Sequence, residues 1–202
     1  MSYADPYEGR LAAPRSRDRR DGILGLYDGI TNGLERATAD WFTGFALRFA
    51  FASVLMVYYM HSAWGSLDGS LLNLFSPSDG AYATMLPPIA EAAGYDKSEI
   101  ATFPWYFVVL AGTWGELILP VLVVIGLFTR IAAAGMIVVV FVQSYVDIAF
   151  HGLEEKSIGA MFDRLSDAVI LDQRLLWVTI LVLLVVNGAG ALSLDRLLAG
   201  RR

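Results

Sequence analysis

The chain has 202 residues, of which 56% are hydrophobic and 17% are charged, and its formal net charge is −5. Soluble domains are usually about 45–50% apolar and about 25% charged, so this composition indicates a membrane protein. The negative charge argues against nucleic-acid binding. The absence of cysteine excludes a disulfide, an iron–sulfur cluster and a thiolate nucleophile. Any redox role must therefore use a bound cofactor or a partner protein.

The first 40 residues are expected to form a cytoplasmic extension. Apolar side chains recur at helical spacing from Ile23 to Trp41, which predicts an amphipathic helix over residues 22–40 on the cytoplasmic membrane surface. Four glycines in this segment weaken the prediction.

Four stretches are apolar over the length that a bilayer core about 30 Å thick requires, which is about 20 helical residues. They cover about residues 41–64, 104–128, 131–150 and 175–192. The sequence thus predicts an all-α integral membrane protein, a bundle of four transmembrane helices. Ten of the 15 Lys and Arg residues lie in the terminal segments and the loop between the second and third spans. By the positive-inside rule, both termini are predicted to be cytoplasmic.

Two segments on the outer side are longer than plain turns. Residues 65–103 are expected to form a long polar loop, in which the pair Pro87-Pro88 should break any helix. Residues 157–169 are predicted to form a short interfacial helix, because five apolar side chains share one helical face.

Arg48 and Glu116 are the only charged residues deep in the predicted spans. Each is costly in lipid unless it is paired or faces water, so we expect an intramembrane polar pair between antiparallel helices. The pair could fix the register of the helices or could serve a ligand or a proton. Arg48 could alternatively extend to the inner interface without a partner.

A second candidate site lies in the outer half of the spans, where His61, Asp147 and His151 fall at a similar depth. Three such groups could bind a divalent metal, and two histidines could ligate a haem. Aromatic side chains in the same half also allow a quinone pocket, and they include Tyr58, Trp64 and Trp114. Solvated polar groups and an interfacial aromatic belt explain the same residues without a ligand.

Two motifs resemble a known family. Residues 115–120 (GELILP) and 126–130 (GLFTR) resemble the "GE…LP…GL(F/L)TR" signature of the DoxX family, and residues 187–195 (NGAGALSLD) resemble its "GxGxxSLD" ending. Arg48 matches the arginine of the family's first span. The similarity extends over about residues 41–198, and Glu116, Pro120, Arg130 and Asp195 match the pattern.

The resemblance implies a four-helix protein of the bacterial inner membrane. The family is related to the small membrane subunit of thiosulfate:quinone oxidoreductase and to membrane partners of redox and stress-defence enzymes. It implies a membrane subunit or anchor of a quinone-linked oxidoreductase, with a quinone as candidate cofactor and with other membrane or peripheral subunits as partners. Catalysis by the chain itself stays open. The alternatives are a small-molecule or metal-handling membrane protein and a structural partner of a larger complex.

The motif residues also have folding roles that need no ligand. Gly126 suits a helix end, Arg130 fixes topology, and Ser193 can cap a short helix over residues 194–199. A structural role is accordingly expected for the motif residues Gly115, Pro120, Gly126, Arg130, Gly190, Ser193 and Asp195.

Overall fold

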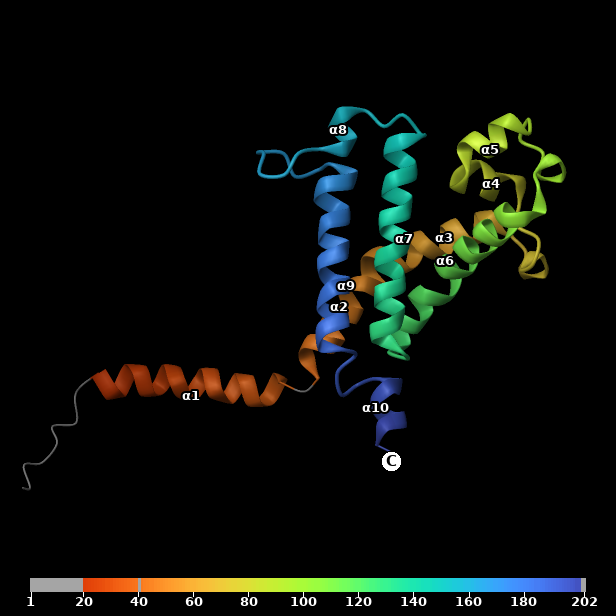
Figure 1. Cartoon of the computed structure of the whole chain (residues 1–202). Coiled ribbons are helices and arrows are strands. Elements are labelled where there is room, and N and C mark those ends of the chain that lie inside the picture. Colours follow the sequence, from red (N-terminus) through yellow and green to blue (C-terminus); the bar gives the residue numbers. More distant parts are fainter. Residues whose placement is uncertain (1–19, 40, 201–202) are drawn as a thin grey trace, which may run out of the picture. The chain divides into compact units, whose positions relative to one another are not determined.

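The computed structural model describes residues 20–39 and 41–200, and the chain divides into two compact units, residues 1–39 and residues 40–202. In the first unit the described residues form helix α1 (Arg20–Thr38), which covers most of the predicted amphipathic segment (Figure 1). Leu26, Ile30 and Leu34 recur every fourth residue and are exposed, so they form an apolar stripe along the helix. Residue 40 lies outside the described residues.

The second unit contains four helices that are long and apolar enough to cross a membrane, which confirms the predicted fold class. The first spans Phe42–Ser66 and consists of α2 (Phe42–Phe51), a π-helical stretch (Ala52–Met56) and α3 (Val57–Ser66). The second covers Thr102–Ile125 and contains α6 (Phe107–Ile125); before α6, Phe103 has non-helical φ and ψ of −102° and 130°, so the continuous helix begins after this residue. The third is α7 (Thr129–Ala149).

The fourth span begins and ends earlier than predicted. It consists of a π-helical stretch (Val169–Arg174) followed by α9 (Leu175–Asn187), so it starts six residues before the predicted residue 175. It ends at Gly188, whose φ of +78° leaves the helical region.

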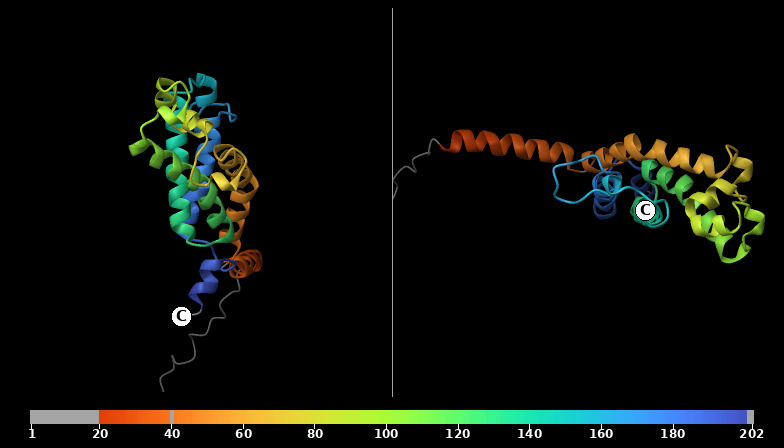
Figure 2. Two further views of the ribbon diagram at one scale, coloured as in Figure 1. Left: turned by 90° about the vertical axis from the view of Figure 1, so that its right-hand side faces the viewer. Right: turned by 90° about the horizontal axis from the view of Figure 1, so that it is seen from above.

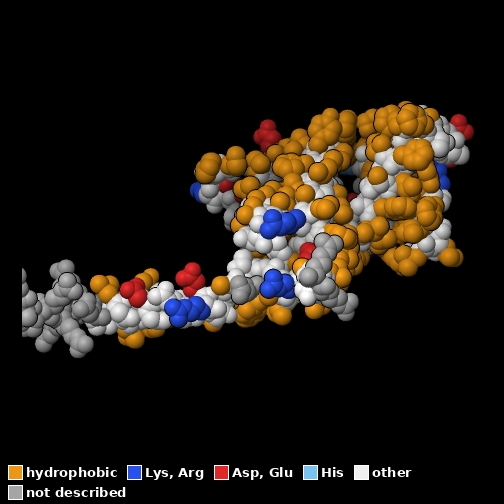
Figure 3. Space-filling model, turned by 60° about the horizontal axis from the view of Figure 1, so that its bottom comes forward, with side chains coloured by type: hydrophobic (Ala, Val, Ile, Leu, Met, Phe, Trp, Pro, Cys, Tyr) orange, Lys and Arg blue, Asp and Glu red, His pale blue; other side chains and the backbone are white. Residues whose placement is uncertain are grey.

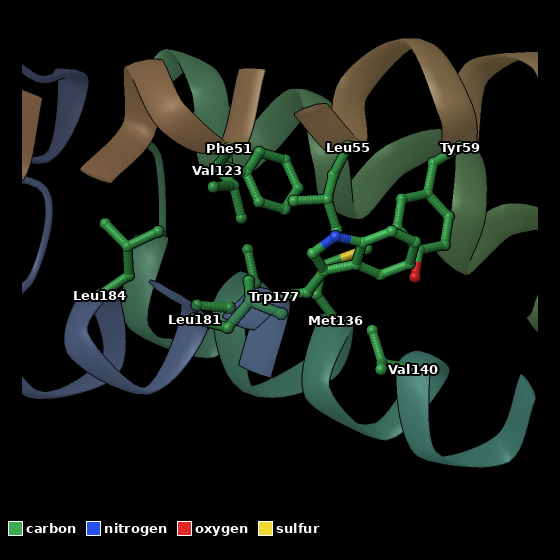
Figure 4. Packing of buried hydrophobic residues seen from close by; sticks show 11 residues of the cluster. Phe51, Leu55, Tyr59, Val123, Met136, Val140, Trp177, Leu181 and Leu184 are labelled. Carbon is green, nitrogen blue, oxygen red and sulfur yellow. The ribbon is translucent and has the colours of Figure 1, made fainter. Parts of the chain in front are cut away.

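The four spans pack around one apolar core. α7 lies between α6 and α9, α2 contacts α9, and α3 contacts α6 (Figures 1 and 2). The largest core side chains come from all four spans and are Phe51, Leu55, Tyr59, Val123, Met136, Val140, Trp177, Leu181 and Leu184 (Figure 4). The outer faces are also apolar, as Val138, Phe141 and Tyr145 on α7 show. Helices that are apolar all round suit a lipid environment.

Residues 67–101 and 150–168 lie at one end of the bundle, which we call the loop end. The first of these segments contains 3₁₀ turns (Leu71–Asn73 and Lys97–Glu99) and the short helices α4 (Asp79–Met85) and α5 (Pro87–Ala92). α4 ends at Met85, directly before the predicted break at Pro87-Pro88, and Pro87 then starts α5, which the prediction did not include. Proline is tolerated in a first turn because the N–H that it lacks would have no helical partner.

The interfacial helix predicted over residues 157–169 does not form. Only α8 (Glu155–Ile158) is helical, and it ends at Gly159, where φ is +76°. Residues 159–168 then follow a non-helical path, and Phe162 is fully exposed with φ of +65°. Gly159 and Phe162 both have positive φ, and these left-handed residues interrupt any helix over this segment.

Candidate functional site

Arg48 and Glu116, the predicted intramembrane pair, have separate partners. Arg48 is buried on α2, and its guanidinium donates to the carbonyl oxygens of Val124 (2.9 Å) and Leu192. Val124 belongs to the last turn of α6, where carbonyl groups lack helical donors. Glu116 instead accepts hydrogen bonds from side chains of α3 and α7. The predicted ion pair is therefore not formed.

Residues 126–130 and 188–199 meet at the end of the bundle opposite the loop end, which we call the motif end. The carboxylate of Asp195 accepts hydrogen bonds from the main-chain N–H groups of Phe128 (2.7 Å) and Thr129 (3.0 Å) and from the Thr129 hydroxyl (2.8 Å). It thereby satisfies donors at the start of α7 that have no helical partner. The Asp195 N–H donates to the carbonyl of Gly126 (2.8 Å), so the turn before α7 is tied to the C-terminal segment.

That C-terminal segment forms helix α10 (Leu194–Ala199), and the Ser193 hydroxyl accepts a hydrogen bond from the Arg196 N–H (3.2 Å). The helix and its cap occur where the sequence places them. Ser193 also packs closely against Gly126, which has φ of +73°. A Cβ at Gly126 would lie 2.6 Å from the Cβ of Ser193, so any side chain there would force this contact to shift.

The other motif residues play different parts. Gly190 has φ of +75°, and its main chain contacts Gly44 of α2. A Cβ at Gly115 would meet Val139 at an ordinary 3.5 Å, so close helix approach does not require this glycine. Pro120 lies inside α6 and has no N–H, which leaves the Glu116 carbonyl without its usual helical donor.

A cavity of about 150 Å³ lies between α3, α6 and α7, and residues at the end of α4 close it toward the loop end. Its lining contains Tyr58, Ser62, Thr84, Met85, Val108, Gly112, Glu116, Val142, Gln143, Val146 and Asp147. Val108 and Val142 are about half exposed on the outer faces of α6 and α7. The cavity therefore adjoins the surface that faces lipid.

Glu116 is the centre of a chain of hydrogen bonds beside this cavity. The Tyr59 hydroxyl donates to Gln143 Oε1 (3.1 Å), Gln143 Nε2 donates to Glu116 Oε1 (2.7 Å), and the Ser62 hydroxyl donates to Glu116 Oε2 (2.8 Å). Glu116 is 4% exposed, and no cation within the described part of the chain forms an ion pair with it. All its side-chain partners are neutral side chains, which hold it between two spans.

An ion pair stands at the edge of the same cavity. Arg174, at the start of the fourth span, contacts Asp147 of α7 (2.5 Å) and donates to the Ser144 hydroxyl (3.0 Å). The Arg174 side chain is 6% exposed and that of Asp147 is 28% exposed. Buried ion pairs are costly to break, so this pair joins the third and fourth spans.

The predicted cluster of His61, Asp147 and His151 does not assemble. α7 ends at Ala149, so Asp147 and His151 do not share a helical face. His151 Nε2 instead lies 3.1 Å from the carbonyl oxygen of Thr84, and His61 is exposed. Within residues 20–39 and 41–200, no group of three or more His, Asp or Glu residues could hold a metal ion.

Of the three aromatic residues predicted for a quinone pocket, one lines the cavity and two lie elsewhere. Tyr58 lines the cavity, whereas Trp64 is about half exposed beside Gly69. Trp114 Nε1 donates to the carbonyl of Leu74 (2.8 Å), and its ring packs edge-on against Phe75. Trp114 thus anchors the loop end. Of the six residues predicted for the second candidate site, Tyr58 and Asp147 line the cavity, and His151 contacts the part of α4 that covers it.

Sequence reasoning did not place Ser62, Gln143 and Arg174 in the site. A polar-residue scan at helical spacing could have found the first two, because Ser62 follows Tyr58 by four residues and Gln143 precedes Asp147 by four. Arg174 gave no such signal, because the fourth span was expected to begin after it.

The fold and the polar cavity together define an integral membrane protein of four helices. A family model described as DoxX matches residues 43–152, which is more than half of the chain. The chain therefore belongs to the DoxX family, as the motifs predicted. The match contains the first three spans, and the fourth span and residues 187–195 lie beyond it. No similar protein was found among curated proteins or among solved structures.

Proposed function

We propose that this DoxX family protein is a membrane subunit or anchor of a quinone-linked oxidoreductase in the bacterial inner membrane, and that the cavity beside Glu116 holds the quinone ring. The observation that carries the proposal is a buried carboxyl group beside a cavity that adjoins the lipid-facing surface. Quinones are lipid-soluble, so a site of this kind is reached from within the bilayer.

The dimensions and the donors of the cavity fit a ring with a tail. Pockets that enclose a whole drug-sized ligand usually measure about 300–1,000 Å³, so a cavity of about 150 Å³ holds one ring and leaves a longer tail outside. Val108 and Val142 border the route by which an isoprenoid tail would reach lipid. Tyr58 and Gln143 line the cavity and carry the donors that a ring carbonyl requires, namely the Tyr58 O–H and the second amide N–H of Gln143, since the Ser62 hydroxyl already donates to Glu116.

Glu116 is suited to hold a proton beside the ring. A bound quinone takes up two electrons and two protons when it becomes a quinol, and a chain without cysteine must receive those electrons from a partner subunit. Glu116 would exchange protons at its carboxyl oxygens, while Ser62 and Gln143 keep the carboxyl group oriented. The chain would then act as the quinone-binding platform of the complex.

The distribution of basic residues supports an orientation for this complex. Lys and Arg are concentrated in the terminal segments and in the turn between α6 and α7, which favours cytoplasmic termini. The Glu116 cavity would then open in the outer half of the membrane, and partner subunits would deliver electrons from that side.

The test is quinone binding by the full chain in lipid nanodiscs. We expect a short-chain ubiquinone or menaquinone analogue to bind the wild-type protein. E116Q should bind it at least about tenfold more weakly, because the substitution removes an ionisable hydrogen-bonding group. E91Q, which changes an exposed glutamate on α5, is the matched control and should bind as the wild type does. Equal affinity of E116Q and wild type, or no binding by either, would contradict the proposal.

A further inference from the structure

A second and larger hollow, of about 620 Å³, lies at the motif end of the bundle. The first turn of α7, the segment after α9 and helix α10 enclose it, with residues 128–131, 188–191, 193, 195, 196 and 199 in its lining. It is separate from the Glu116 cavity, and the two hollows share no lining residue.

Two arginines in this hollow have no side-chain partner within the described part of the chain. Arg130 and Arg196 are both exposed, and their side chains form no hydrogen bond and no ion pair with the rest of the described chain. Arg130 lies against Gly188, where an added Cβ would be 3.4 Å from its Nε atom. Gly188 thus leaves the guanidinium room to lie close to the main chain.

Asp195 is the one carboxylate among the described lining residues, and it forms no ion pair with either arginine. Asp195 already accepts three hydrogen bonds from Phe128 and Thr129. A hollow with two free guanidinium groups and an occupied carboxylate is therefore complementary to an anion.

The hollow also borders apolar surface at the ends of the spans. Phe128 and Ile131, both in its lining, are mostly exposed, and Leu197 and Leu198 of α10 are exposed nearby in sequence. Figure 3, turned so that this end comes forward, shows blue Lys and Arg side chains next to orange hydrophobic ones. Basic groups that adjoin lipid-facing surface at the end of a transmembrane helix lie at the depth of lipid phosphates.

We propose that the motif-end hollow binds a phosphate group, supplied by the headgroup of an anionic phospholipid, through Arg130 and Arg196. The acyl chains would lie along the exposed apolar side chains of this end. The lipid would cover the hollow and hold the turn before α7 and helix α10 at the membrane surface. This role is independent of quinone binding.

The test compares lipid binding to the full chain in detergent by native mass spectrometry. Wild-type protein should bind phosphatidylglycerol in clear preference to phosphatidylcholine, and R130Q/R196Q should lose about thirtyfold in affinity for phosphatidylglycerol. K156Q/R164Q removes two exposed charges at the loop end and should keep the wild-type preference. Unchanged thermal unfolding and quinone binding of R130Q/R196Q would show that the variant is folded.

Two outcomes overturn the proposal. One is a preference for phosphatidylglycerol that survives in R130Q/R196Q, because the arginines would then not form the site. The other is full displacement of phosphatidylglycerol by millimolar inorganic phosphate, which would assign the hollow to a soluble anion. Retention of the lipid in the presence of phosphate supports the headgroup.

Discussion

Asp195 at the motif end and Glu116 beside the cavity both accept hydrogen bonds through their carboxylates, but they bind different kinds of donor. Asp195 accepts from two main-chain N–H groups and one hydroxyl, whereas Glu116 accepts from the side chains of Ser62 and Gln143. A main-chain donor is fixed by its helix, while a side-chain donor can rotate to a new acceptor. The motif end thus holds the architecture, and the Glu116 cavity keeps polar groups that a ligand can engage.

The two buried arginines repeat this difference. Arg48 donates to main-chain carbonyl groups at the motif end, and Arg174 donates to the side chains of Asp147 and Ser144 near the cavity. In each of them the Nε atom is buried without a hydrogen-bond partner. The contacts of Arg174 join the third and fourth spans next to the cavity, so the cavity region also contains residues with a structural role. Variants at both ends of the bundle can therefore test which residues act in stability and which act in ligand binding.

The largest effect is expected from the ion pair at the cavity. D147N leaves the nearly buried guanidinium of Arg174 without its counter-ion and should lower the free energy of unfolding by about 3–4 kcal/mol. R174Q should cost less, because the Asp147 side chain that remains is 28% exposed and can reach water. Chemical unfolding of the two single variants and of the double variant measures which substitution lowers the free energy of unfolding more. A larger loss for R174Q than for D147N would contradict it.

Removal of the carboxylate at the motif end should lower stability without changing quinone binding. D195A removes three hydrogen bonds to a charged group and is expected to lower the free energy of unfolding by about 2–3 kcal/mol. Quinone affinity of the folded fraction should stay at the wild-type value. D167A, at an exposed aspartate of the loop end, serves as the control and should change neither quantity. Weakened quinone binding with unchanged stability would break the separation of the two ends.

Two glycines with positive φ separate backbone strain from steric conflict. G94A places a Cβ at φ of +61° in open space and should cost about 1 kcal/mol. G126A has similar strain at φ of +73°, and its Cβ would also lie 2.6 Å from that of Ser193, so a total of about 2 kcal/mol is expected. Unfolding curves of the two variants give the difference. Equal losses would mean that the contact between the turn and α10 is not tight.

The smallest change in stability is expected inside the cavity. S62A removes one of the two side-chain donors to Glu116 and should alter the free energy of unfolding by at most about 1 kcal/mol, while quinone affinity falls several-fold. S53A makes the same exchange in the same span, where the hydroxyl bonds only the Phe49 carbonyl, and should leave affinity unchanged. If S53A and S62A had equal affinities, Ser62 would have no part in the site.

Features that depend on nearby residues were predicted well. The four spans follow from the length and hydropathy of each segment, and α10 occurs over residues 194–199 because its cap is set by Ser193. Local patterns also misled. Residues 157–169 have helical periodicity, but Gly159 and Phe162 adopt positive φ and interrupt a helix there. The pair Pro87-Pro88 was expected to break a helix, and α4 does end directly before it, but Pro87 also begins α5.

The sequence by itself determined the membrane class, the four spans, the family and the two short motifs, because hydropathy, capping and turn chemistry are local properties. The tertiary structure alone decided which polar groups meet. Arg48 and Glu116 are similar candidates for pairing in sequence, yet each bonds to different segments of the bundle. The π-helical stretch at residues 52–56 interrupts the α-helical hydrogen-bond pattern between α2 and α3, and the sequence pattern does not reveal this interruption. Side chains on neighbouring spans find their partners only when the rotation and register of each helix are fixed.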